Sequence, residues 1–399
     1  MEYSQVLVIA ISLFVAVASY LRFRDPLYPP VIHSSLWALV VFLFALNSDA
    51  FYPLSWKLYF LVGFGCFAFA LGSYIATYEF RPEHKVWRFP VETNWLLVAL
   101  LTISVIGLPF YVRRAYQVAA GGPTGNLLVD LRFNMLVQHQ EFGVLVYLVP
   151  LATVVAGIHL LVAPSKRLQT AISVIVALAY SILTTGRTSA FALIFLLFGI
   201  QLVTRRLKVK YATIGILACL AVFFVGVAIV QGKGINVDAS FKDNLALLGE
   251  NVRTYLLGAL PALDSFMRSD PAPALGAYTL RFFFVLGDKL GLALPVRSEL
   301  PWVKVPAMTN VYTVYQPYFA DFSFPGAATV QIFLGFFHGI LYRRATSGDP
   351  MFICLFSLAL YPLALQVFAE QYFLGLSLWI QCTIVLWVYF RLWGMLRSR

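Results

Sequence analysis

Several arginines in this 399-residue chain lie where an apolar segment ends, and their guanidinium groups could bind phosphate or pyrophosphate. Planar guanidinium forks match the geometry of phosphate oxygens and stay charged at any pH. Contact with lipid headgroups is the competing interpretation. The candidates for binding an anionic ligand are Arg113, Arg114, Arg132 and Arg187, with Arg253 and Arg281 as weaker ones.

Arg187 has the most specific surroundings of these arginines, the hydroxyl-rich turn from Thr184 to Ser189. The apolar segments on either side are about 17 and 15 residues, or roughly 25 and 22 Å of helix, against a hydrocarbon core of ~30 Å. We therefore expect the turn to lie below the outer membrane surface. An arginine at that depth must face protein, water or ligand, because exposure to lipid is costly.

A second group of residues leads into a late apolar segment and suits sugar chemistry. Aromatic rings pack on the C–H faces of sugars, and amide groups bond their hydroxyls. An aromatic belt at the membrane interface is the competing interpretation. Asp321 is our candidate general base, with His139 and Glu250 as fallbacks. The candidate sugar-binding residues are Asn310, Tyr312, Tyr315 and Tyr318.

Other ionisable groups carry weaker indications. We expect Asp264 and Glu370 to be solvated outside the membrane, and His159 and His338 to be structural. The four cysteines lie in apolar segments without CxxC spacing, and no HExxH spacing occurs. We therefore expect neither a metal nor a cofactor.

The composition requires a membrane protein. Hydrophobic residues make up 60% of the chain and charged residues 12%, against about 25% charged in soluble domains. The net charge of +11 is spread over the edges of apolar segments rather than gathered on a soluble face, which argues against a nucleic-acid partner. We predict an all-α polytopic fold in one membrane domain, residues 1–399, with about eleven spans. They lie near 3–21, 31–48, 57–77, 94–112, 143–163, 168–184, 189–203, 211–231, 325–341, 351–369 and 373–390.

Basic residues set the orientation. With the N-terminus outside, 16 lysines and arginines lie in the inside connections and 5 in the short outside connections. This asymmetry predicts an outside N-terminus and a cytoplasmic C-terminus. Residues 232–324 then form one large outside loop, in which 245–260 has the apolar spacing of a surface helix. Residues 278–294 are apolar, but Arg281, Asp288 and Lys289 argue against a twelfth span.

The chain resembles the bacterial oligosaccharide repeat-unit polymerases, the Wzy-type O-antigen polymerases. Three stretches carry the resemblance: Thr184 to Ser189, Tyr255 to Phe266, and Asn310 through Asp321 and Gly326 to Arg344. The plan of ten to fourteen spans with one late outside loop is also similar. Some family members have arginines at Arg-x10-Gly spacing, which Arg114 and Gly125 match, and we find no second clear copy.

The resemblance implies a glycosyltransferase at the periplasmic face of the bacterial inner membrane. Donor and acceptor would be glycans linked to undecaprenyl pyrophosphate, held among membrane lipids, and a chain-length regulator would be the protein partner. The arginines would stabilise the leaving pyrophosphate, and Asp321 would deprotonate the acceptor hydroxyl.

Three other functions compete with polymerisation. An O-antigen ligase would transfer the polymer to lipid A–core, but such ligases typically carry a histidine in the large loop, and 232–324 contains none. A transporter of the lipid-linked unit would call for polar groups at mid-membrane. Only thin signals of that kind occur, namely Gln331, Gln366, Gln381, His159 and His338. A purely structural scaffold would leave the outside arginines unexplained.

Overall fold

The computed structural model describes residues 2–82, 95–230, 249, 253–254, 257–292, 300–306 and 308–397. The described part of the chain is mostly helical, and its two short strands pair antiparallel. The chain divides into two compact units. The first comprises Met1–Glu83, Phe241–Ser347 and Pro362–Ser377, and the second His84–Ser240, Gly348–Tyr361 and Leu378–Arg399.

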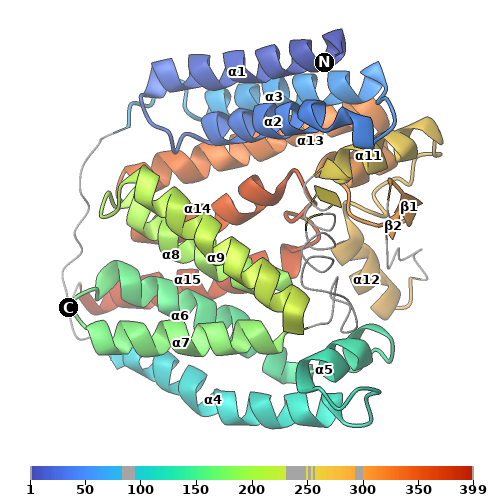
Figure 1. Cartoon of the computed structure of the whole chain (residues 1–399). Helices are drawn as coiled ribbons and strands as arrows, with labels where there is room; N and C mark the ends of the chain where they lie inside the picture. Colours follow the sequence, from blue (N-terminus) through green and yellow to red (C-terminus); the bar gives the residue numbers. More distant parts are fainter. Residues whose placement is uncertain are drawn as a thin grey trace. The chain divides into compact units, whose positions relative to one another are not determined.

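The first unit is built on four long helices with short elements at one end (Figure 1). The long helices are α1 (Tyr3–Phe23), α2 (Pro29–Leu46), α3 (Trp56–Ala76) and α13 (Tyr315–Thr346). The short elements are the 3-10 turn η1 (Ser48–Ala50), α11 (Ala259–Arg268), α12 (Arg281–Lys289), β1 (Val303–Lys304) and β2 (Met308–Thr309).

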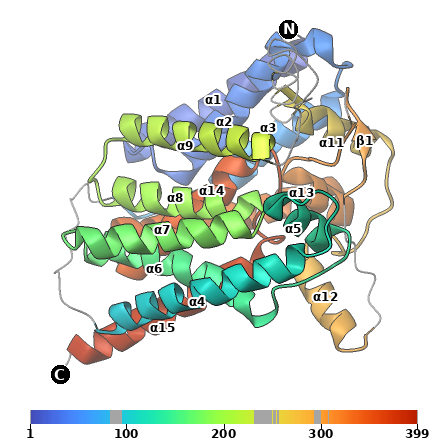
Figure 2. The same ribbon diagram turned by 60° about the horizontal axis from the view of Figure 1, so that its bottom comes forward.

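The second unit is a bundle of helices (Figure 2), in which α6 contacts α4, α7 and α8. Its elements are α4 (Trp95–Ala119), α5 (Leu127–Leu136), η2 (Gly143–Tyr147), α6 (Leu148–Val162), α7 (Arg167–Leu183), α8 (Arg187–Val203) and α9 (Val209–Val230). Most of α14 (Pro350–Leu365) and α15 (Leu376–Arg397) also belongs to it.

Helix length and composition support an all-α membrane protein. Seven of the helices described are long and apolar enough to cross a membrane, and four shorter apolar helices accompany them. Together they coincide with the eleven apolar segments read from the sequence. The number of spans and their orientation remain predictions, because length and composition alone do not place a helix in a bilayer.

Glycines bring α3 and α13 into close contact. A Cβ added at Gly72 would overlap the Ile332 carbonyl oxygen, and one at Gly335 would overlap the Phe69 carbonyl oxygen. The Ser73 hydroxyl donates a hydrogen bond to the Gly335 carbonyl at 2.7 Å. Small residues of this kind let membrane helices approach until their backbones touch, which replaces the hydrophobic driving force missing in lipid.

The core of the second unit joins α4, α5, α6, α7 and α8 through apolar side chains. Tyr111 of α4 stacks on Phe142 with ring centroids 4.3 Å apart and meets Tyr180 of α7 edge-on at 4.9 Å. The Tyr180 hydroxyl donates to the Ser104 carbonyl at 2.9 Å. These contacts align α4 with α7 and bring the end of α4 to the turn that follows α7.

Helix boundaries differ most from those expected at α4, α13 and α15, and α15 continues to Arg397 instead of ending near residue 390. Helix α4 continues to Ala119 instead of ending near residue 112, so Arg113 and Arg114 lie within its last turns. Helix α13 begins at Tyr315, ten residues before the expected span, and is interrupted at Ser323. Proline occurs readily in the first turn of a helix, where its missing N–H leaves no bond unmade, and Pro317 and Pro325 occupy such positions here.

The long connection contains short helices. Residues 281–289 form α12, about 13 Å long at 1.5 Å per residue and too short to cross a membrane, as expected from its charges. The helix expected over 245–260 lies largely outside the described residues, and α11 begins at Ala259. The single domain expected from the sequence remains a prediction.

Candidate functional site

One end of the second unit brings together the four strongest arginine candidates. Arg113 and Arg114 lie in the last turns of α4, Arg132 lies in α5, and Arg187 begins α8. Both α7 and α8 have 17 residues, or about 25 Å of helix each, which is shorter than the ~30 Å hydrocarbon core. Both helices are therefore shorter than a full membrane crossing, and the depth of the turn between them stays a prediction.

Arg132 connects α5 to the turn before Arg187. Its Nη1 donates to the Thr185 carbonyl oxygen at 3.1 Å. Thr185 itself has a left-handed backbone, with φ at 51°, and the Thr184 hydroxyl donates to the Ser181 carbonyl at 2.8 Å. These bonds fix the path of the backbone that presents Arg187.

Arg114 anchors the segment that follows α5, whereas Arg113 is exposed. The Nε and Nη2 atoms of Arg114 both donate to the Glu141 carbonyl, at 3.2 and 2.8 Å. A phosphate at Arg114 would have to share or replace these bonds. Arg113 carries no such requirement, so it is the more accessible member of the pair.

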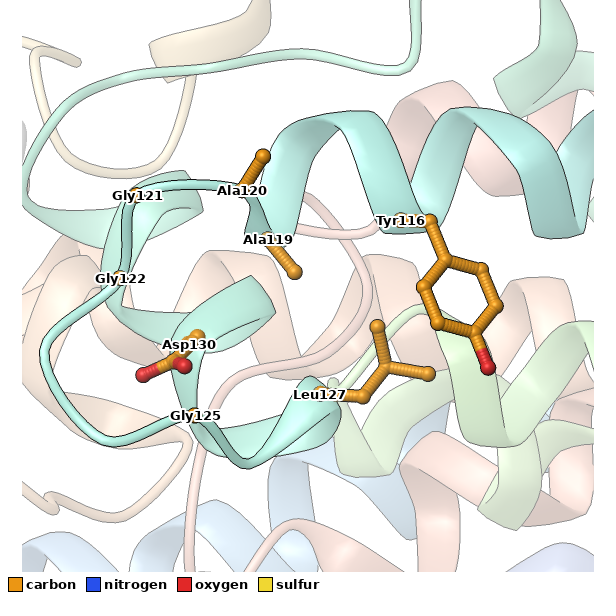
Figure 3. A pocket seen from close by; sticks show the side chains of 8 residues that line it. All are labelled: Tyr116, Ala119, Ala120, Gly121, Gly122, Gly125, Leu127 and Asp130. Carbon is orange, nitrogen blue, oxygen red and sulfur yellow. The ribbon is translucent and has the colours of Figure 1, made fainter.

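A pocket of about 280 Å³ lies at the end of α4 (Figure 3). It is lined by Tyr116, Ala119, Ala120, Gly121, Gly122, Gly125, Leu127 and Asp130. Gly125, the residue at Arg-x10-Gly spacing from Arg114, is therefore part of a pocket wall. The lining contains one carboxylate, that of Asp130, and no arginine. The pocket itself is therefore not an anion site.

Asp130 holds the loop around the pocket together. Its Oδ1 accepts bonds from the Thr124 backbone N–H at 2.9 Å and the Thr124 hydroxyl at 2.7 Å. Burial works to raise the pKa of this carboxyl, but hydrogen bonds from Thr124 and the Gly125 N–H outweigh burial and lower it. Gly122 must lack a side chain here, since a Cβ would overlap Asp130.

Asp321, the candidate base, lies in the first unit and is fully buried. Its Oδ1 accepts from the Tyr278 N–H at 3.1 Å and its Oδ2 from the Thr279 N–H at 2.5 Å. The Ala274 N–H donates to the Ala320 carbonyl at 2.9 Å. Asp321 thus ties the 274–279 loop to the first part of α13. Each carboxylate oxygen can still accept a further hydrogen bond.

The three candidate sugar-binding tyrosines are enclosed by protein. Tyr312, Tyr315 and Tyr318 are 2%, 0% and 0% exposed, so none presents a ring face to solvent. The Tyr312 hydroxyl donates to the Pro301 carbonyl at 2.8 Å, and the ring centroids of Tyr315 and Trp37 lie 5.2 Å apart. Asn310 is partly exposed. The tyrosines therefore shape the interior of the unit, and Asn310 is the member of this set nearest to solvent.

Glu370 is the acid whose environment was least apparent from the sequence. It was expected to be solvated but is 2% exposed, and Asp264, also expected to be solvated, is 0% exposed. The Glu370 carboxylate accepts from the Tyr318 hydroxyl at 3.0 Å and from the N–H groups of Tyr372, Phe373 and Leu374. Burial raises the pKa of Glu370, and these bonds oppose the rise. The sequence signal that could have indicated this burial is the position of Glu370, a single acidic residue between two apolar segments.

Asp264 is held by its neighbours in a similar way. Its Oδ1 accepts from the Ser55 N–H at 3.0 Å and from the Ser55 hydroxyl. Its Oδ2 pairs with Arg268 at 2.7 Å. The carboxylate therefore fixes α11 to the start of α3, which accounts for its burial.

The remaining candidates are spread over the two units. His139 is exposed in the second unit with φ at 54°. Arg253 and Arg281 are half-buried in the first unit, and Glu250 lies outside the described residues. Within the described ranges, no group of three or more histidine, cysteine, aspartate or glutamate side chains could hold a metal ion.

These features define an all-α, multi-pass membrane protein with arginines gathered at one end of a helical unit. The chain is similar to an O-antigen polymerase of Shigella dysenteriae, with 25% identity over 150 residues. The match spans 36% of this chain and 37% of that relative. No family model matches the chain, and no solved structure does.

Proposed function

We propose that the chain is a membrane glycosyltransferase that polymerises undecaprenyl-pyrophosphate-linked repeat units into O-antigen or a related surface polysaccharide. The cluster of Arg113, Arg114, Arg132 and the α8 start at Arg187 carries this proposal. Guanidinium groups at the end of a membrane bundle suit a ligand that is both anionic and lipid-linked. The similarity to an O-antigen polymerase supports the same reaction class.

The reaction needs one bond exchange and one proton transfer. A hydroxyl oxygen of the acceptor sugar attacks the anomeric carbon of the donor glycan, and the bond from that carbon to the pyrophosphate oxygen breaks. The bonding electrons leave with undecaprenyl pyrophosphate, and the hydroxyl proton passes to a base. Because pyrophosphate is a good leaving group, no general acid is required. Holding the two lipid-linked partners in line would supply much of the rate.

The proposed roles follow from the chemistry of each side chain. Arg187 and Arg113, with Arg114 and Arg132, stabilise the negative charge that develops on the pyrophosphate. Asp321 accepts the proton, with His139 or Glu250 as fallback. Arg253, Arg281, Asn310 and the buried Tyr312, Tyr315 and Tyr318 contribute to substrate binding.

The proposal also includes an arrangement in the membrane. The chain crosses the bacterial inner membrane about eleven times with its N-terminus outside, and the arginine end of the second unit faces the periplasm. The large loop 232–324 lies on the same face. The partners of the protein are the lipid-linked donor and acceptor, membrane lipid and a chain-length regulator protein. The proposed reaction requires no metal or cofactor.

The decisive experiment compares lipopolysaccharide from a deletion strain complemented with the wild-type chain or with Arg187→Ala. We expect a single repeat unit on the core in the deletion strain, a restored ladder with the wild type, and no ladder with Arg187→Ala at normal membrane abundance. Arg167→Ala, at the opposite end of α7, is the matched control and should restore the ladder. A normal ladder from Arg187→Ala would remove that residue from the mechanism. Bare core in the deletion strain would indicate a ligase instead.

A further inference from the structure

The first part of α13 lies inside the first unit instead of at its surface. Residues 324–346 alone are about 34 Å of helix at 1.5 Å per residue, enough to cross a bilayer. The preceding piece, from Tyr315 to the interruption at Ser323, is therefore additional to the span. A Cβ at Gly65 would overlap the Tyr315 hydroxyl. Because Gly65 is near the middle of α3, the tip of Tyr315 reaches the middle of that helix.

The helix is interrupted at Ser323 by a strained backbone conformation. Ser323 has φ 57° and ψ −161°, a conformation that is rarely adopted by residues other than glycine and costs about 1–3 kcal/mol. In membrane proteins, broken helices are tolerated where protein or a polar cavity surrounds them, and they commonly form binding sites.

Buried polar groups without hydrogen-bond partners surround the broken helix. Among the described residues, unpartnered atoms include the amide Nε2 of three glutamines, the Trp37 Nε1, the Tyr315 hydroxyl and the His338 Nδ1. The glutamines are Gln316, Gln331 and Gln366, each at most 1% exposed. Each such group costs about 1–3 kcal/mol when left unsatisfied, so a set of this size needs an explanation.

These groups form one connected region. The His33 ring stacks on the Phe69 ring with centroids 4.2 Å apart, and the centroid of the His338 ring lies 5.6 Å from that of Phe69. His33 also lies close to Gln331. Trp37, one helical turn after His33 in α2, contacts the Tyr315 ring at 5.2 Å.

The third glutamine joins the region through the backbone. The Val314 N–H, next to Tyr315 and Gln316, donates to the Gln366 carbonyl at 2.7 Å. The Tyr372 hydroxyl, in the same connection as Gln366, pairs with the His338 Nε2 at 2.9 Å. The connection after α14 is thus bonded to the residue that precedes α13 and to the second part of that helix.

We propose that this polar interior, formed by Trp37, Tyr315, Gln316, Gln331 and Gln366, binds an uncharged sugar residue of the acceptor glycan. The inference rests on the proposed function and assigns the acceptor sugar a site in the first unit. The glutamine amides donate to sugar hydroxyl oxygens, and the Trp37 and Tyr315 rings pack on sugar C–H faces.

The side-chain chemistry favours a neutral polyhydroxyl ligand over an anion. Amide, indole and phenol groups make up the set, and no arginine or lysine belongs to it. Aromatic rings beside the unpartnered donors fit a sugar better than water, which uses no ring face. Ordered water alone is the alternative occupant, and the experiment below separates the two.

The test replaces each glutamine with leucine, which has a similar volume and no polar atom. Full-length protein in nanodiscs is assayed for transfer to the lipid-linked repeat unit, with acceptor titrated at saturating donor. Free repeat-unit oligosaccharide, released from pyrophosphate by mild acid, serves as a neutral competitor. We expect Gln316→Leu, Gln331→Leu and Gln366→Leu each to raise the acceptor KM and weaken this competition about tenfold, with the apparent Tm unchanged or raised. Inhibition by inorganic pyrophosphate should not change.

Two outcomes would overturn the proposal. An unchanged acceptor KM with a raised Tm would show that the interior is only hydrated, because removing unsatisfied groups would then be purely stabilising. Loss of folded protein in all three variants would identify a structural polar network. Gln201→Leu in α8 of the second unit is the control and should leave KM unchanged. Absence of transfer by the wild type would contradict the proposed function itself, which keeps the two failures distinct.

Discussion

The two units place their polar groups differently. In the second unit the ionisable groups of interest lie at one end, where Arg114, Arg132 and Asp130 each bond to a turn or loop. In the first unit the polar groups lie in the interior, where glutamines, histidines and Glu370 surround a broken helix. A charged ligand suits the first arrangement and a neutral ligand the second. The proposed transfer reaction, with an anionic leaving group and a sugar acceptor, would use both.

The largest expected effect comes from breaking the helix contact that supports the interior of the first unit. Gly72→Val places a side chain against the Ile332 carbonyl, and the backbones of α3 and α13 cannot then approach. We expect a loss of roughly 4 kcal/mol or more of folding stability, seen as failure to recover monodisperse protein in detergent.

A glycine of the second unit provides the matched control. A Cβ at Gly186 would come no closer than 3.8 Å to its neighbours, and the residue has an ordinary φ of −88°. Gly186→Ala should therefore yield normal amounts of folded protein. Equal tolerance of both substitutions would contradict the close α3–α13 contact.

Asp321→Asn probes the proposed base and should reduce kcat by about 10²- to 10⁴-fold. The substitution also exchanges one acceptor oxygen for an amide, opposite the N–H of Tyr278 or Thr279. Transfer should be measured with donor binding and the apparent Tm. Retained donor binding would support a base, whereas a joint fall of kcat, donor binding and Tm would limit Asp321 to anchoring the 274–279 loop.

Much of the helical architecture is predictable from composition, because long apolar segments of a membrane protein satisfy their backbone polar groups as helices. The eleven apolar segments all coincide with helices. The misplaced boundaries occur where polar or proline-containing sequence is nevertheless helical. Tyr315 to Phe322 looked like a loop because it contains Pro317 and Asp321, yet packing of Tyr315 against α2 and α3 makes it a buried helix.

The candidate sites were likewise predictable in part. The arginines could be identified from their position against the charge rule, and the structure places the backbone of four of them toward one end of a unit. The hydrogen bond from Arg132 to Thr185 could not be foreseen, since it depends on how α5 folds back on the core. Glu370 looked solvated because hydropathy does not reveal that three backbone N–H groups and Tyr318 surround its carboxylate.

Arg132→Ala should give a smaller effect in the second unit. Loss of the bond to Thr185 loosens the turn that presents Arg187, and a displacement of about 1 Å can cost about 100-fold in rate. We expect kcat to fall between tenfold and 100-fold with little change in Tm. Arg132→Lys retains a donor and should recover part of the rate. If lysine gives no recovery, the guanidinium group contacts the substrate directly and does more than position the turn.

The smallest expected effect concerns how the free energy of unfolding depends on pH. One acid of each unit should contribute to this dependence with opposite sign. Burial raises the pKa of Glu370 above 4.5, so the native state binds its proton more tightly than the unfolded state. The Glu370 contribution to the unfolding free energy therefore falls as pH rises from about 4.5 through the raised native pKa. Glu370→Gln should remove this fall.

Asp130 should show the opposite slope, because its hydrogen bonds hold its native pKa below 3.8. Its stabilising contribution is complete above that value and is lost as pH falls through the native pKa. Apparent Tm values between pH 3 and 8 for the wild type, Glu370→Gln and Asp130→Asn should therefore diverge in opposite directions, by about a few degrees. Parallel curves for the two variants would mean that the units do not differ in how they hold a buried carboxylate. Opposite slopes would extend the contrast between them from geometry to energetics.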